Sequence, residues 1–442
     1  MPASRPAKPV SEENRKLRDE IEKKYKKTPE ELFAERQKRL WDAVQMKVPD
    51  KVPVVFGGTF FACKYAGIPY SAAYYNAPAW RSAFKKMIVD MAPDAFGYAP
   101  NESGLALESL DTNYTRWPGY NLPDNVAFQI TEKEYMKEDE YDLFLADPSD
   151  YIVRYWLPRV YGVMDPLSKL PPLQTLGTNV AGVTALFASP EFEKLAKAMK
   201  KAGEAEVKWR SELGGLQEEM ASLGFPDANM GTRGGVAPPF STFTNSFRTF
   251  NGAVRDMFRQ PDKLKAALQK MLDYRISRAV PAVKIPGRPT IGMSGEPHRV
   301  SDEFFSPKQF EEFVWPYWKQ AMEKTYALGY DIISMFFEGR RDKQIQYFMQ
   351  YPKGSMLIRF AESDIFKAKE MLGDRACFMG NVPIAMLQVG STTDVEEYCK
   401  KLFKTVGKNG GFILRCSTDF TQEANPKNVK AMIDAAEKYG RY

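Results

Sequence analysis

Glu338 carries the carboxylate whose setting in the sequence best suits acid–base chemistry. It follows Ile332 to Phe337, a run of six residues that are all apolar or small. A carboxylate at the end of such a run should emerge at the rim of a dry pocket, where desolvation raises its pKa and makes it a general acid near neutral pH. The alternative is a buried carboxylate paired with Arg340 or Arg341, which follow directly.

The single histidine of the chain, His298, ends a Gly-Glu-Pro-His turn. An imidazole in this place could serve as an acid, a base or a metal ligand, although a lone histidine can also be a hydrogen-bonded loop residue. Glu296 could face the same cavity, contact the substrate or orient the imidazole. One histidine excludes HExxH proteases and every site that needs two imidazoles.

Four further candidates lie in or directly after other apolar runs. Cys416 is either a soft metal ligand or a small buried hydrophobe. Asp419 shares its loop and could supply a second catalytic carboxylate, while Asn381 could contact the substrate or hold a loop. Phe336 precedes Glu338 by two residues and, with its aromatic neighbours, indicates an apolar or aromatic substrate.

Strand-like runs that alternate with helical segments place these candidates. The runs in the last third are Ile332 to Phe337, Met356 to Phe360, Cys377 to Met379 and Phe412 to Leu414. Strands that alternate with helices of this length indicate parallel βαβ units. In a (β/α)₈ barrel the chemistry lies where each strand ends, which is where Glu338, Glu362, Asn381 and Cys416 stand.

The upstream sequence supplies the remaining elements. We expect strands at Val52 to Phe56, Leu173 to Leu176 and Pro289 to Met293. Helices are expected over 11–27, over 28–46 with a Thr28–Glu31 capping box, and from Ser189 towards Leu223. The prediction is therefore an α/β protein: a TIM (β/α)₈-like barrel over residues 46–442, preceded by an N-terminal helical extension over residues 1–45.

Composition excludes several function classes. The net charge of +6 arises largely in residues 1–52, where both signs mix along helical patterns, so we expect no nucleic-acid partner. No apolar run approaches the roughly 18 residues that a membrane helix needs, and no secretory signal is visible, so we expect a cytoplasmic protein without a membrane partner. The four cysteines form no CxxC pair, which indicates neither a disulfide framework nor a zinc ribbon.

Several segments resemble the uroporphyrinogen decarboxylase superfamily, which includes cobalamin-dependent methyltransferases. They are SPKQFEEFVWPYWKQ, DIISMFFEG, SDIFKAKEMLGDRACFMGNVP and PKNVKAMIDAAEKYG, together with ERQKRLWDAVQMKVPDKVPVV and APPFSTFTNSFRTFNGAVRDMF upstream. The decarboxylase itself has an Arg-Gln-Ala-Gly-Arg stretch after its first strand for the substrate carboxylates. Here that place reads GGTFFACKYAGIP and holds no arginine, which argues against the decarboxylase reaction.

The methyltransferase branch typically carries His-x-Cys-Gly at the strand end, with a later cysteine completing a zinc site. Phe336 and Glu338 occupy the histidine and cysteine positions in this chain, and Cys416 lies two residues before the later one. The resemblance therefore leaves Glu338, His298 and Cys416 as an alternative ligand set for zinc.

The resemblance implies a methyltransferase component that moves a methyl group from a small substrate to a corrinoid protein. The corrinoid (cobalamin) would arrive on that partner, because the chain has no Asp-x-His-x-x-Gly loop. Glu338 would activate the leaving group, either as proton donor or as metal ligand. Two alternatives stay open: a metal-free lyase or decarboxylase using Glu338 and His298, and a non-catalytic subunit that lost its zinc site. A homo-oligomer is possible.

Overall fold

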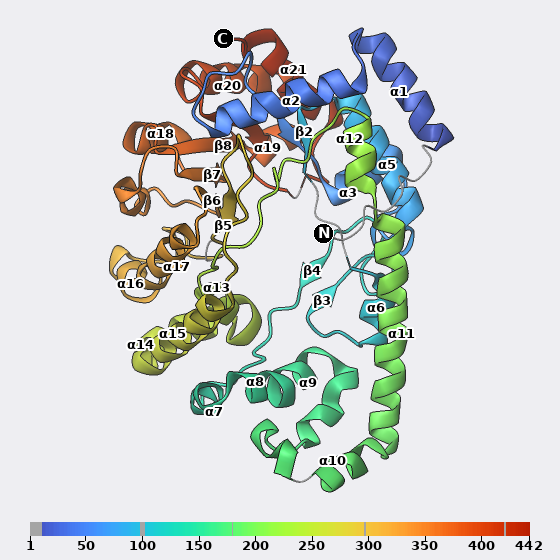
Figure 1. The fold of residues 1–442 in the computed structure, drawn as a ribbon, viewed down its shortest axis with the longest axis vertical. Coiled ribbons are helices and arrows are strands. Elements are labelled where there is room, and N and C mark those ends of the chain that lie inside the picture. Colours follow the sequence, from blue (N-terminus) through green and yellow to red (C-terminus); the bar gives the residue numbers. More distant parts are fainter. Residues whose placement is uncertain (1–10, 98–101, 179, 296–297, 420) are drawn as a thin grey trace.

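A parallel sheet in the order β5-β6-β7-β8-β9 positions the candidate residues (Figure 1). The computed structural model describes residues 11–97, 102–178, 180–295, 298–419 and 421–442. The strands of this sheet are β5 (Ile291–Met293), β6 (Ile332–Phe337), β7 (Met356–Phe360), β8 (Ala376–Val382) and β9 (Phe412–Cys416). The four strands predicted in the last third are confirmed, β6 and β7 to the residue.

A second parallel pair continues the sheet beyond β9. It consists of β1 (Val55–Phe56) and β2 (Ala95–Phe96), and a bridge between Val54 and Leu414 joins it to β9. From β2, a bridge between Phe96 and Asp227 leads to segment 227–235, which returns to β5 through Arg233 N–H to the Ile291 carbonyl at 3.2 Å. The α/β class with a parallel sheet is thus confirmed. In the described residues the pairings form no continuous eight-stranded ladder, because segment 227–235 is irregular.

The two faces of the sheet bury different side chains. Alternate residues of each strand pack outward against the helices, in a large apolar core. The opposite, inner face begins as an apolar layer to which Ile332, Leu357, Cys377 and Ile413 contribute, and Leu40, Ala43 and Val44 of α2 close that layer. Further along the strands, towards their carboxyl ends, the same inner face carries Phe336, Arg359, Met379 and Arg415.

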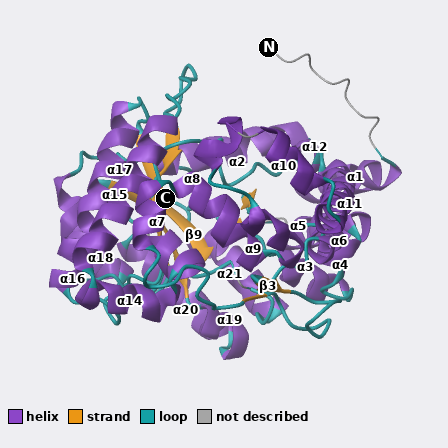
Figure 2. Cartoon of the chain, turned by 90° about the horizontal axis from the view of Figure 1, so that it is seen from below, coloured by secondary structure: helices purple, strands orange, loops and turns teal. Residues whose placement is uncertain are grey.

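Helices surround the strands (Figure 2). They are α1 (Glu12–Tyr25), α2 (Pro29–Val44), α3 (Thr59–Ala66), α4 (Ala72–Tyr75), α5 (Ala77–Met91), α6 (Gly104–Ser109), α7 (Tyr141–Ala146), α8 (Pro148–Tyr151), α9 (Leu157–Val160), α10 (Val180–Phe187), α11 (Pro190–Leu213), α12 (Leu216–Ser222), α13 (Phe240–Thr242), α14 (Thr249–Arg259), α15 (Pro261–Arg278), α16 (Pro307–Phe313), α17 (Trp315–Ala327), α18 (Ile365–Leu372), α19 (Ile384–Val389), α20 (Thr392–Thr405) and α21 (Pro426–Tyr439). The small antiparallel pair β3 (Thr115–Arg116) and β4 (Gln129–Ile130) lies in the segment between β2 and α7. None of the described helices is long and apolar enough to cross a membrane.

Helix starts follow the capping signals. Thr28 and Glu31 form the predicted capping box of α2, and Ser306 caps α16 in the same way with Gln309. The helix expected from Ser189 towards Leu223 is instead two helices, because Gly214 and Gly215 interrupt it and Gly215 has a φ of 85°.

One strand predicted in the first half of the chain is wrong. Leu173–Thr178 forms a 3-10 helix, not a strand, because the segment finds no partner strand and the Thr175 N–H bonds the Pro172 carbonyl at 2.8 Å. The aromatic residues Phe60, Phe61 and Tyr74 in the same half of the chain are at most 4 % exposed and belong to the core. Their packing requires no ligand.

Candidate functional site

The Glu338 carboxylate and the His298 imidazole form a pair at the carboxyl end of β6. Nδ1 of His298 lies 2.8 Å from Oε2 of Glu338. The two side chains are 45 % and 47 % exposed, so solvent and a substrate can reach them. Both residues are predicted from the sequence as catalytic candidates, and the structure brings them together from segments 40 residues apart.

Neighbouring groups fix the geometry of this pair. The His298 backbone N–H donates to Oγ of Ser241, which lies on α13, at 2.7 Å. The Arg299 backbone N–H approaches Oε2 of Glu338 at 3.4 Å, from a residue with a φ of 59°. On the other side, Nε of the fully buried Arg341 donates to the Glu338 carbonyl at 3.1 Å. Hydrogen bonds at the backbone of His298 and at the backbone of Glu338 therefore fix the position of each residue.

The pKa of Glu338 differs from the expectation. The hydrogen bond from His298 lowers the pKa of this carboxyl and outweighs burial, which raises it. The prediction of a raised pKa is wrong, because its argument considered only desolvation and not the imidazole that meets the carboxylate. Glu338 is therefore ionised at neutral pH, and its carboxylate accepts a hydrogen bond from the imidazole.

Asp419 takes part in a separate cluster with two arginines. Nη1 of Arg359, on β7, donates to its Oδ2 at 2.5 Å, and Nη2 of Arg415, on β9, donates to its Oδ1. Burial opposes ionisation of Asp419, yet the two guanidinium groups hold the pKa at about 2. A carboxylate with so low a pKa is a poor proton carrier near neutral pH, so Asp419 is better suited to orienting the arginines.

Arg359 and Arg415, the two arginines that bind Asp419, are not among the residues predicted from the sequence. A signal was present: each is the one charged residue in an otherwise apolar strand, MLIRF and FILRC. Charged residues are rarely buried unless they are paired or functional, so an arginine inside a buried parallel strand indicates either an ion pair or a binding role. The guanidinium of Arg359 lies 4.4 Å above the ring of Phe336, a predicted substrate-contacting residue.

Asn381 holds a loop. Its amide nitrogen donates to the Ser363 carbonyl at 3.1 Å, and its oxygen accepts from the Tyr398 hydroxyl at 2.9 Å. The side chain is buried with these bonds made, which agrees with the loop-holding alternative rather than with contact to a substrate. Asp364 likewise acts structurally, because its carboxylate caps α18. Glu296 lies outside the described residues.

The zinc ligand set Glu338, His298 and Cys416 does not come together. Cys416 lies on the outward face of β9, buried in the core, and its Sγ donates to the Thr418 carbonyl at 3.0 Å. Burial also raises the pKa of the thiol, which disfavours the thiolate that zinc binds. Among the described residues, no group of three or more His, Cys, Asp or Glu side chains is placed to hold a metal ion. The donor set therefore does not fit zinc.

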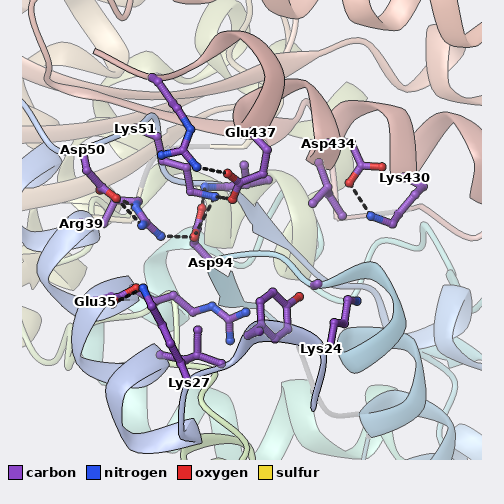
Figure 3. Close-up of a pocket in the computed structure, with 17 residues that line it drawn as sticks. Lys24, Lys27, Glu35, Arg39, Asp50, Lys51, Asp94, Lys430, Asp434 and Glu437 are labelled. Atoms are coloured by element: carbon purple, nitrogen blue, oxygen red, sulfur yellow. Dashed lines mark hydrogen bonds and ion pairs between the residues drawn. The ribbon is translucent and has the colours of Figure 1, made fainter. Parts of the chain in front are cut away.

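A large polar pocket lies at the opposite end of the strands (Figure 3). Side chains of α1, α2 and α21 line it, and ion pairs occupy it: Arg39 with Asp50 and Asp94, and Lys51 with Glu437. The amino ends of strands in such folds serve stability rather than chemistry. We therefore place the candidate active site at Glu338 and His298 and assign this pocket to the attachment of the helical extension.

Comparison with known proteins agrees with this architecture. A family model described as Uroporphyrinogen decarboxylase (URO-D) matches residues 181–439, which is more than half of the chain. A solved structure, a methyltransferase from Methanosarcina mazei, is similar at a TM-score of 0.53 and 15% sequence identity, covering 91% of this chain and 98% of that chain. At this identity the likeness speaks for the fold. The search of curated proteins gives no significant match.

Proposed function

We propose that this chain, which belongs to the uroporphyrinogen decarboxylase (URO-D) family, is the methyltransferase component of a corrinoid-dependent system. It would take a methyl group from the oxygen, nitrogen or sulfur of a small substrate and deliver it to a corrinoid protein. The family match and the fold shared with a methyltransferase support this class of reaction. Membership of this family also supports a (β/α)₈ barrel. Its wall would consist of β1, β2, segment 227–235 and β5 to β9.

The observation that carries the proposal is the Glu338–His298 pair at the carboxyl end of the sheet. Methyl transfer breaks the bond between the methyl carbon and a heteroatom, and the bonding electron pair stays on that heteroatom. A proton delivered there makes the departing group a better leaving group. An imidazolium next to a carboxylate is suited to that delivery, since the carboxylate orients the ring and stabilises its charged form.

In this mechanism His298 is the proton donor and Glu338 is its positioning partner. The carboxylate engages Nδ1, so Nε2 on the other side of the ring is the atom that gives up the proton. After the proton has moved, the imidazole is neutral and the leaving group carries the proton away. The partner's corrinoid supplies the nucleophile that accepts the methyl group, and the open end of the sheet is the surface on which it would dock.

The test is methyl transfer to cob(I)alamin, followed by the absorption of methylcobalamin. The methyl donors are anisole, 4-methoxybenzoate, trimethylamine and dimethyl sulfide, each tried separately. For every donor that the wild type uses, we expect Glu338→Gln and His298→Asn to lower kcat by about 10² to 10⁴, the usual worth of positioned acid–base catalysis. Glu362→Gln, an exposed carboxylate after the neighbouring strand, is the matched control and should leave kcat within about twofold.

Two results would contradict the proposal. If Glu338→Gln folds and transfers methyl groups at the wild-type rate, the pair has no part in the reaction and a non-catalytic subunit becomes the better description. If no donor yields methylcobalamin while 4-methoxybenzoate is consumed with release of CO₂, the chain is a decarboxylase on the same frame. Circular dichroism of each variant separates lost chemistry from lost folding.

A further inference from the structure

Arg359 is a buried cation whose hydrogen bonds are incomplete. Its residue is 9 % exposed, and it projects from β7 onto the inner face of the sheet. Nη1 is used by Asp419, but Nε and Nη2 are both buried and have no hydrogen-bond partner among the described residues. Unpartnered buried donors are costly and uncommon, and one reason for their presence is a ligand that completes them.

Among the described residues, the cluster of Arg359, Arg415 and Asp419 has one positive charge in excess. Arg359 and Arg415 share a single counterion, Asp419, whose two oxygens each accept from a different arginine. Burial and the proximity of Arg415 both act to lower the pKa of Arg359. Within this cluster, two cations and one anion therefore leave room for one further negative charge.

We propose that Arg359 binds the carboxylate of the methyl-bearing substrate, so that the substrate class is a small monocarboxylate. This inference rests on the proposed function, whose site it extends. Nε and Nη2 form one edge of the planar guanidinium, with two parallel N–H groups at the spacing of the two oxygens of a carboxylate. A monoanion brings the cluster to neutrality, whereas a phosphate or sulfate dianion would overshoot it.

The position of Arg359 relative to the acid–base pair suits a bound substrate. Arg359 is in register with Phe336 and lies 4.4 Å above its ring. Glu338 is two residues beyond Phe336 on the same face, a rise of about 7 Å along an extended chain. A carboxylate held by Arg359 would thus leave a methyl-bearing heteroatom several ångströms away, towards His298, with Phe336 between them as an apolar wall.

A purely structural role fits the contacts less well. Arg248, which is also fully buried, shows what a structural arginine looks like: its Nε and Nη2 donate to Asp256, and its Nη1 donates to the Met136 carbonyl. Arg359 has one such bond and two buried donors on the inner face that no described residue satisfies. The contrast indicates that the acceptor for Nε and Nη2 of Arg359 is a ligand rather than a part of the chain.

The experiment is calorimetric titration of the full chain with benzoate and with benzamide, its neutral isostere. We expect the wild type to bind benzoate at least tenfold more tightly than benzamide and Arg359→Met to lose that preference. Arg359→Lys, which keeps the charge but not the two-donor edge, should weaken benzoate binding at least fivefold. Arg340→Met removes an exposed positive charge from the same end of the sheet and should leave benzoate binding within twofold.

The outcomes separate the two proposals. Equal affinity for benzoate and benzamide, or full benzoate binding by a folded Arg359→Met, overturns the carboxylate assignment. Sulfate that competes as well as benzoate overturns it too, because the site would then be a general anion site. Glu338→Gln should bind benzoate like the wild type while failing in methyl transfer. If it binds benzoate and also turns over normally, the carboxylate site stands and only the proposed function fails. If Arg359→Met does not fold, Arg359→Lys decides.

Discussion

At the scale of single residues, the site is built from charges that constrain one another. Glu338 is kept ionised by His298, and Asp419 is kept ionised by Arg415 and Arg359, although burial opposes ionisation of both carboxyls. Neither carboxylate is thus the neutral acid that desolvation alone would produce. In the proposed reaction the imidazole of His298 therefore takes the role of the acid, and Glu338 orients its ring.

The depressed pKa of Asp419 links this cluster to acid stability. An aspartate has a pKa of roughly 3.9 in an unfolded chain, and here the value is about 2. The stabilising effect of ionised Asp419 is therefore complete above about pH 5 and declines as pH falls through 4 towards 2. We expect Asp419→Asn to lower the melting temperature at pH 7 and to lower it clearly less at pH 3.

Thermal melts of wild type and Asp419→Asn across pH 2.5 to 8 measure this difference. Asp374→Asn is the control, since its carboxylate forms an ion pair with a single exposed lysine, Lys353, whereas that of Asp419 pairs with two arginines. A gap between wild type and Asp419→Asn that stays constant down to pH 2.5 would show that the carboxylate does not act through its charge.

At the scale of elements, sequence signals were most reliable where local and tertiary preferences agree. The runs IISMFF and MLIRF are strands because they are buried on both faces, as parallel strands between two layers are. The run LQTL at Leu173 to Leu176 is shorter and half polar, and it lies on the surface after two prolines, where it forms a 3-10 helix. Arg359 and Arg415 escape prediction because the apolar residues identify each strand, and the single charged residue within it does not change that assignment.

The start of α18 tests a structural assignment at this scale. The Asp364 carboxylate accepts from the backbone N–H groups of Phe366 and Lys367 at 3.0 and 3.1 Å. We expect Asp364→Ala to reduce the free energy of unfolding by about 1 kcal/mol, the usual worth of an N-cap. Methyl transfer by the folded variant should be unchanged, because the residue holds a helix and touches no substrate.

Urea denaturation of Asp364→Ala and of Asp364→Asn measures this cost. Asparagine is an equally good capping residue and should restore nearly all of the lost stability. If asparagine fails to restore it, the charge of Asp364 rather than its cap bond would matter, and the assignment of a capping role would be mistaken.

At the scale of the whole molecule, the helical extension is part of the core and not an appendage. Leu40, Ala43 and Val44 of α2 complete the apolar layer on the inner face of the sheet. Arg39, on the same helix, forms a buried ion pair with Asp94 at 2.5 Å (Figure 3). The division into residues 1–45 and 46–442 stays a prediction about domains, whereas the packing indicates that neither part would be stable without the other.

Asp94→Asn should show how strongly this attachment contributes. Asp94 is 3 % exposed and also accepts from the Val54 N–H at 2.9 Å, so its loss leaves Arg39 and Lys51 without a buried counterion. We expect the free energy of unfolding to fall by about 3 kcal/mol. Asp50→Asn, which removes the exposed partner of Arg39, should cost less than about 1 kcal/mol. Urea denaturation distinguishes the two, and equal costs would contradict the assignment.

The contacts that α2 and Val52 make with the last strands and residues of the chain have a consequence for its biosynthesis. Val52 donates to the carbonyl of Gly440 at 2.8 Å, and Ile413 of β9 shares its apolar layer with α2. At roughly 5 to 20 residues per second, a ribosome needs about 20 to 90 seconds to make 442 residues. Throughout that interval the apolar stripe of α2 has no finished surface to cover. The apolar stripe of α2 therefore stays uncovered on the nascent chain for longer than in a protein whose amino-terminal half closes its own core.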